Sequence, residues 1–83
     1  MEEENMLEKL RGIMVNYVDV DPKDIKKESR LAEDLGLTSF ALMSMMGEIE
    51  DEFDITIVEE ELTGIFTVDD VLKYISKKQK ENK

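Results

Sequence analysis

Three stretches of the chain repeat apolar residues at the spacing of an amphipathic helix. The first stretch spans residues 2–17, the second stretch spans residues 39–52, and the third stretch begins at Thr67. Apolar residues at positions i, i+3 and i+4 form a stripe along one side of a helix, which is buried against other elements. The apolar positions of the first stretch are Met6, Leu7, Leu10, Ile13, Met14 and Tyr17. The pattern therefore predicts three main helices whose stripes face one another.

The segments between these helices predict loops and short turns. Pro22 can begin a helical turn in a first loop that continues to Thr38, which is unusually long for so small a domain. Residues 54–57 predict an extended connector, and residues 59–62 predict one short helical turn. The polar residues 77–83 are expected to form a flexible tail. Four apolar residues are expected to hold the first loop to the core: Ile25, Leu31, Leu35 and Leu37.

These elements predict an all-α fold: a small four-helix bundle of three main helices and one short helix, with a long first loop. With 83 residues, the chain is expected to form a single domain over residues 1–83. Thr38 is a good N-cap for the second main helix. Residues 67–70 (Thr-Val-Asp-Asp) match a capping box, with Asp70 in place of the usual Glu.

Charge and composition narrow the possible functions. The net charge is −10, and no Lys or Arg lies between Leu31 and Leu72, a stretch that holds 12 carboxylates. This argues against nucleic-acid binding and favours partners with basic surfaces. No apolar run is long enough to cross a membrane, and the acidic residues 1–5 do not resemble a signal peptide, so a cytoplasmic protein is expected. The chain has no Cys and no His, which excludes thiolate metal sites and the usual catalytic triads. We therefore predict neither a metal site nor an enzyme.

Ser39 follows a glycine turn and opens the second main helix. Gly36 lies three residues before it, and the cap residue Thr38 directly precedes it. The first turn of a helix offers free backbone N–H groups and the positive end of the helix dipole, which favour a phosphate on the Ser39 hydroxyl. The alternative is that Ser39 is only a helix-start residue beside the cap, and the local sequence alone favours that alternative.

From the first helix to about Ile75, the chain resembles the acyl carrier protein family. The resemblance rests on the turn at residues 34–36 (Asp-Leu-Gly), the helix after Ser39, the acidic residues 50–54, and residues 66–68 (Phe-Thr-Val) before the last helix. It implies that Ser39 carries 4′-phosphopantetheine, which a phosphopantetheinyl transferase moves from coenzyme A. It also implies a non-catalytic carrier that holds its cargo as a thioester and meets acyl-loading and chain-processing enzymes with basic docking patches. A monomer without membrane insertion is expected.

Two residues beside the serine depart from the family pattern. Thr38 stands where aspartate is usual, and Phe40 stands where leucine is usual. These two departures bear on which phosphopantetheinyl transferase acts on the protein. Ala41 and Ser44 occupy turns where members that serve bacterial fatty acid synthesis usually carry acids. We therefore expect a partner-binding surface that is apolar near the serine and acidic farther away, consisting of Phe40, Met43, Gly47, Glu48, Glu50 and Asp51.

Three functions remain open on the sequence. The first is a discrete acyl carrier protein for fatty acid, specialised acyl or polyketide biosynthesis. The second keeps the arm and changes the cargo, as in aminoacyl, peptidyl or D-alanyl carriers. The third is an acidic protein-interaction module of the same fold without the arm. A mass increase on Ser39 after exposure to coenzyme A and a transferase separates the third function from the other two.

Overall fold

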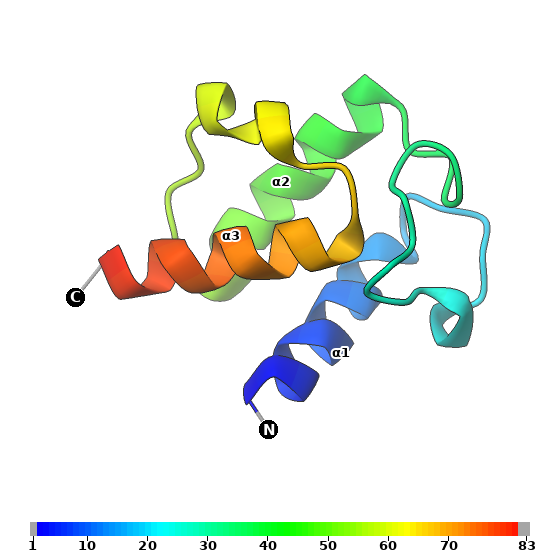
Figure 1. Ribbon diagram of the computed structural model, residues 1–83, viewed down its shortest axis with the longest axis horizontal. Helices are drawn as coiled ribbons and strands as arrows, with labels where there is room; N and C mark the ends of the chain where they lie inside the picture. The colour runs from blue at the N-terminus through cyan, green and yellow to red at the C-terminus, as the bar shows by residue number, and fades with distance from the viewer. Residues whose placement is uncertain (1, 82–83) are drawn as a thin grey trace.

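The computed structural model describes residues 2–81, with side chains from Asn5 onward. Three α-helices form the body of the molecule: α1 (Glu2–Met14), α2 (Ser39–Phe53) and α3 (Val68–Glu81). Figure 1 shows α3 crossing in front of α2, with α1 beneath them. Two 3-10 helices lie in the connections, η1 (Pro22–Asp24) and η2 (Glu59–Gly64), and the residues described contain no strand. The all-α prediction of three main helices and a short one is confirmed.

The core lies where the apolar stripes of the three helices meet. Leu10 and Met14 of α1 and Ile49 of α2 have no exposed surface, and neither has Ile75 of α3. Burying such side chains is the main driving force for packing the helices, at roughly 25 cal/mol for each Å² of apolar surface removed from water. The four residues expected to hold the first loop to the core are all buried, at Ile25, Leu31, Leu35 and Leu37.

The first helix is shorter than the sequence pattern predicted. It ends at Met14 rather than Tyr17, and residues 15–17 form a tight turn. In this turn the Tyr17 N–H donates to the Met14 carbonyl at 2.8 Å, and the Asn16 N–H donates to Ile13. Val15 and Asn16 both have lower helix propensity than Met14, which favours ending the helix here. Tyr17 still lies half-buried against the core. Its place in the apolar pattern therefore indicates contact with the core and not a helical backbone.

The last helix is longer than predicted. We expected residues 77–83 to form a flexible tail, but α3 continues to Glu81; residues 82–83 lie outside the described part. Lys78 explains part of the extension, because only 12% of its side chain is exposed and its ammonium group bridges Glu61 at 2.9 Å and Glu81 at 3.3 Å. The bond to Glu61 ties the last turns of α3 to η2.

Two side chains hold the segment between α2 and α3. After the left-handed residue Asp54, which ends α2 with φ 55°, the segment is extended, as predicted. The Ile57 N–H donates to the Glu50 carboxylate at 2.7 Å. The Val58 N–H donates to the Tyr74 hydroxyl at 3.0 Å, and that hydroxyl donates to Glu61 at 2.7 Å. Side chains of α2 and α3 thus satisfy backbone donors that have no strand partner.

Among the residues described, no helix combines the length and the apolar character that crossing a membrane requires.

Candidate functional site

Ser39 is the first residue of α2, as the sequence predicted. Thr38 has extended backbone angles, and its hydroxyl accepts a hydrogen bond from the Ala41 N–H at 3.1 Å. The Thr38 carbonyl accepts the first bond of the helix, from Leu42, at 2.8 Å. Both bonds are those of an N-cap, so the cap expected at Thr38 is confirmed.

A tight turn delivers the chain to this cap. Gly36 has φ 70°, a left-handed conformation that glycine adopts without steric cost. The turn is held by Asp34, whose carboxylate accepts the Arg30 N–H at 2.8 Å and pairs with the Arg30 guanidinium at 3.2 Å. Hydrogen bonds from the Arg30 side chain and backbone lower the pKa of Asp34. The turn at residues 34–36 is therefore a built element, and it fixes the direction in which the chain enters α2.

The first loop is also joined to the start of α3. Residues from both segments exchange backbone hydrogen bonds, and Arg30 and Thr67 form an isolated antiparallel bridge. We call this contact the loop–helix joint; its bonds run from Leu31 N–H to the Phe66 carbonyl at 2.9 Å, from Val68 N–H to the Ser29 carbonyl at 3.0 Å, and from Asp69 N–H to the Lys27 carbonyl at 2.9 Å. Leu31 also accepts the Leu37 N–H at 2.9 Å. Two hydrogen bonds thus connect Phe66, just before α3, to Leu37, the residue that precedes the α2 cap.

The start of α2 leaves its first donors open. Ser39 is exposed, and the N–H groups of Ser39 and Phe40 have no acceptor among the residues described. The first turn of α2 contains no carboxylate. A phosphate ester on the Ser39 oxygen would therefore meet two free donors and the positive end of the helix dipole, without a like charge in that turn. These residues fit a phosphodiester-linked group.

The apolar half of the expected partner surface is exposed next to Ser39. Phe40 is 83% exposed and Met43 is 42% exposed, one turn farther along α2. Gly47 is exposed as well, with open space where a side chain would lie. Exposed large apolar side chains that gather in one place mark binding surfaces more often than single ones do.

The three acids of that surface point to different neighbours. Asp51 is exposed, whereas Glu50 is half-buried and bound to the Ile57 N–H. Glu48 faces Tyr17, in the turn after α1. Burial raises the pKa of Tyr17, and the charge and hydrogen bond of Glu48 raise it further. A groove of about 340 Å³ between the two helices is lined by Gly12, Ile13, Asn16, Glu48, Asp51 and Glu52. Glu48 and Asp51 thus lie together along this groove, whereas Glu50 is bound to the connector after α2. The internal role of Glu50 had no signal in the sequence.

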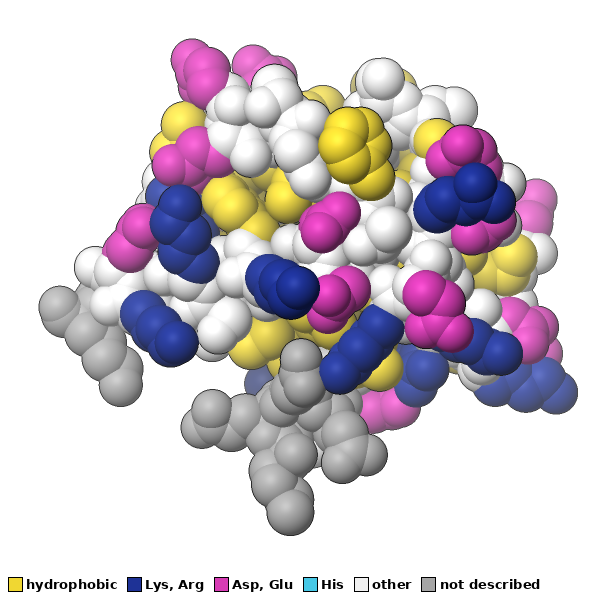
Figure 2. Space-filling model, viewed as in Figure 1, with side chains coloured by type: hydrophobic (Ala, Val, Ile, Leu, Met, Phe, Trp, Pro, Cys, Tyr) yellow, Lys and Arg dark blue, Asp and Glu magenta, His cyan; other side chains and the backbone are white. Residues whose placement is uncertain are grey.

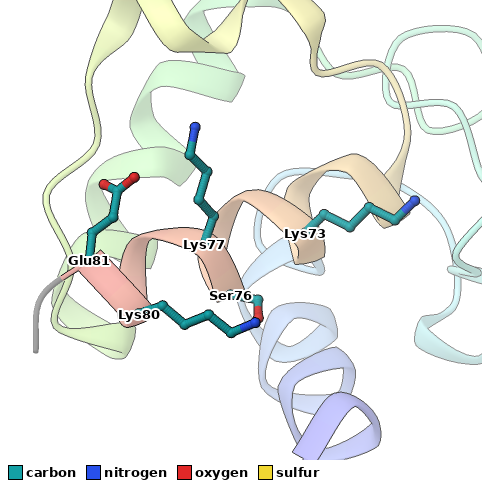
Figure 3. A pocket seen from close by; sticks show the side chains of 5 residues that line it. All are labelled: Lys73, Ser76, Lys77, Lys80 and Glu81. Carbon is teal, nitrogen blue, oxygen red and sulfur yellow. The ribbon is translucent and has the colours of Figure 1, made fainter.

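The hollow shown in Figure 3 lies away from Ser39. It has a volume of about 490 Å³ and is lined by side chains of α3 alone: Lys73, Ser76, Lys77, Lys80 and Glu81. Among the described residues, no group of three or more acidic side chains could hold a metal ion. The start of α2 is thus the place in the described chain that combines an exposed hydroxyl, open donors and an apolar surround.

Comparisons with known proteins bear on the family and the fold of the chain. Residues 8–75 match the sequence pattern of a protein family described as the phosphopantetheine attachment site. Among solved structures, the acyl carrier protein from Enterococcus faecalis, described for its high thermal stability, superposes with a TM-score of 0.76. It is 29% identical in sequence, and the match covers 92% of this chain and 96% of that one.

Proposed function

Because the chain belongs to the family of phosphopantetheine attachment domains, whose covalent cofactor is 4′-phosphopantetheine, we propose that Ser39 is the attachment residue and that the protein is a discrete acyl carrier. Carrier proteins of this kind are generally non-catalytic. They interact with a phosphopantetheinyl transferase and with biosynthetic enzymes. The observation that carries the proposal is the exposed Ser39 hydroxyl at a helix start whose donors are open and whose first turn has no carboxylate.

The other serines of the chain fit the role of attachment residue less well than Ser39 does. Ser29 is half-buried in the loop–helix joint, where its hydroxyl accepts the Lys26 N–H at 3.0 Å. Ser76 lies in the second half of α3. Ser44 is exposed, but it lies inside α2, where the backbone donors are used by the helix itself. Only Ser39 combines exposure with a helix start.

In the proposed carrier, the attached arm supplies a terminal thiol that holds acyl groups as thioesters. The chain's own residues position the arm and present it. Thr38 fixes the start of the helix, and the N–H groups of Ser39 and Phe40 stabilise the negative charge of the phosphodiester. Phe40 and Met43 offer apolar contact to the enzymes that load or process the cargo. One carrier domain spanning the chain, acting as a monomer, suffices for these tasks.

The surface around Ser39 favours a specialised pathway over the housekeeping synthesis of fatty acids. Ala41 and Ser44 provide no negative charge in the first turns of α2, so the partner must recognise apolar contacts there. Acyl, polyketide, aminoacyl, peptidyl and D-alanyl cargoes all attach to the same arm. We propose an acyl or polyketide cargo, and the alternative is an aminoacyl, peptidyl or D-alanyl cargo. The enzyme that charges the arm distinguishes them.

Intact mass spectrometry tests the attachment. The protein is incubated with coenzyme A, Mg²⁺ and a broad-specificity phosphopantetheinyl transferase, and compared with the variants Ser39→Ala and Ser44→Ala. We expect one phosphopantetheine adduct on the natural protein and on Ser44→Ala, and none on Ser39→Ala. An adduct that survives in Ser39→Ala would contradict the assignment. No adduct on any of the three with several transferases would favour the interaction module without an arm.

The partner surface is tested by exchanging an apolar and an acidic residue on α2. The sequence hypothesis compares Met43→Glu with Glu50→Lys and expects the first to weaken partner turnover more. Because Glu50 also binds the Ile57 N–H, Asp51→Lys is the cleaner acidic variant. We expect Met43→Glu to lower the transferase kcat/KM by about tenfold, as loss of a central apolar contact does, and Asp51→Lys to lower it less. The opposite order would contradict the apolar docking surface.

A further inference from the structure

Helix α3 concentrates lysines on a chain whose net charge is −10. Lys73, Lys77 and Lys80 are all exposed, and we call them the lysine surface. Lys73 pairs with Asp69 at 3.1 Å, and neither Lys77 nor Lys80 forms an ion pair with a described residue. Figure 2 shows dark blue side chains along α3 with some magenta carboxylates between them, and further magenta carboxylates at the upper left edge, over η2.

The lysine surface is not shaped to bind a small anion. Figure 3 shows Lys77 and Lys73 extending in different directions and Lys80 running along α3 toward Ser76; the residues that line the hollow all belong to α3. Lys77 extends toward η2 (Figure 3). Hydrogen bonds from Tyr74 and Lys78 are the main cause that lowers the pKa of Glu61 in η2, and the charge of Lys77 lowers it a little further. Lys73 and Lys80 extend elsewhere. The surface therefore acts through its charge rather than through converging hydrogen bonds.

Its charge is felt locally. The molecule measures 35 × 29 × 19 Å, whereas the Debye length at physiological ionic strength is about 8 Å. An approaching protein therefore responds to the side that it meets, and not to the net charge of −10. A basic docking patch is attracted by the exposed carboxylates of α2 and η2, and it is repelled where it meets Lys73, Lys77 and Lys80.

We propose that the lysine surface is an orienting surface, which excludes basic partner patches from α3 and so leaves the carboxylates of α2 and η2 as the region where they dock. This inference rests on the proposed carrier function for its biological use. Without the lysines, α3 would present Asp69, Asp70 and Glu81, and a basic patch could dock there without reaching Ser39. Repulsion at a wrong surface contributes to specificity as much as attraction at the right one.

A cationic probe tests the exclusion without any carrier activity. The backbone amide signals of the ¹⁵N-labelled protein are followed by NMR during titration with a decalysine peptide. We expect shifts in α2 and η2, and none in residues 73–81 apart from Tyr74 and Lys78, which bond Glu61 of η2. In the variant Lys73→Glu/Lys80→Glu, the shifts should extend to residues 73–81. The matched control is Lys23→Glu/Lys26→Glu in the first loop, which changes the net charge equally and should leave residues 73–81 unshifted. Shifts along α3 in the natural protein that equal those in α2, or an unchanged α3 in the variant, would overturn the proposal.

Transferase kinetics test the consequence for docking. Binding in a non-productive orientation lowers kcat and KM by the same factor, so we expect Lys73→Glu/Lys80→Glu to lower both by about threefold while the control keeps its kcat. A lower KM at constant kcat in both variants would show that only net charge matters, and would overturn the orienting role. If the natural protein is not loaded at all, the carrier function fails, and the peptide titration still decides whether α3 excludes cations. Thermal unfolding of both variants checks that each remains folded; the Lys73–Asp69 pair is exposed, so its loss costs little.

Discussion

Helices α2 and α3 are both capped by a threonine, but the backbone N–H groups at their starts have very different surroundings. Thr38 accepts the Ala41 N–H, and Thr67 accepts the Asp70 N–H, each three residues along. At α3, the Asp70 carboxylate in turn accepts hydrogen bonds from the N–H groups of Phe66 and Thr67. The loop–helix joint then uses the next two N–H groups of α3. At α2, no described side chain accepts a bond in this way, and the N–H groups of Ser39 and Phe40 remain open.

The difference shows that a cap alone does not distinguish a structural helix start from a functional one. The open donors of α2 cost some stability, because two N–H groups are left to water or to a ligand. The closed donors of α3 fix the first loop, and with it the turn that leads to Ser39. One helix start is thus used to hold the other in place.

The largest expected effect comes from opening the closed start. Asp70→Ala removes the carboxylate that accepts two backbone N–H groups, and we expect it to lower the free energy of unfolding by about 2 kcal/mol. Thr38→Ala removes one bond at the open start and should cost about 1 kcal/mol. Urea unfolding followed by circular dichroism measures both. Equal losses would mean that the two helix starts are equivalent.

A smaller effect is expected from acid. Hydrogen bonds from the N–H groups of Phe66 and Thr67 lower the pKa of Asp70 below its ordinary value of 3.8. A carboxyl whose pKa is lower in the folded state stabilises the fold at pH values above the unfolded pKa. That stability is lost as the pH falls through the folded pKa. We expect the natural protein to lose more stability between pH 6 and about pH 3 than Asp70→Asn does. Parallel pH profiles for the two proteins would show that Asp70 does not carry this dependence.

The smallest expected effect comes from filling the open start. Ser39→Asp places a carboxylate beside the free donors of α2, which should raise the free energy of unfolding by about 0.5 kcal/mol. Ser44→Asp is the matched control, since Ser44 is also exposed but lies where the helix uses its own donors. A gain of the same size at both positions would mean that the donors at Ser39 are not free. The measurement is thermal unfolding at low ionic strength, where the helix dipole is least screened.

Local patterns predicted the parts of this architecture that local physics determines. Both threonine caps, the position of Ser39 and the four apolar anchors of the first loop could be inferred from spacing alone. The loop–helix joint could not, because backbone groups pair across long sequence distances without any side-chain signature. The end of α1 was missed because Tyr17 keeps the apolar spacing of a helix while lying in a turn. The extension of α3 was missed because it depends on Lys78 meeting Glu61 of another element.

The site itself was predictable to the same degree. The exposure of Phe40 and Met43 follows from their position opposite the buried stripe of α2. The internal bond of Glu50 depends on where the connector returns after Asp54, and no spacing rule contains that information.

The loop–helix joint also sets an order in time. Ribosomes make the chain from its N-terminus, so Ser39 is synthesised well before the residues that complete the joint at Phe66, Val68 and Asp69. Until those residues are present, the Leu31 and Ser29 backbone groups lack their partners, and the turn before Ser39 lacks its anchor. A nascent chain that already displays the serine does not yet display the site. With Ser39 as the proposed attachment residue, its modification should therefore follow the completion of synthesis rather than accompany it.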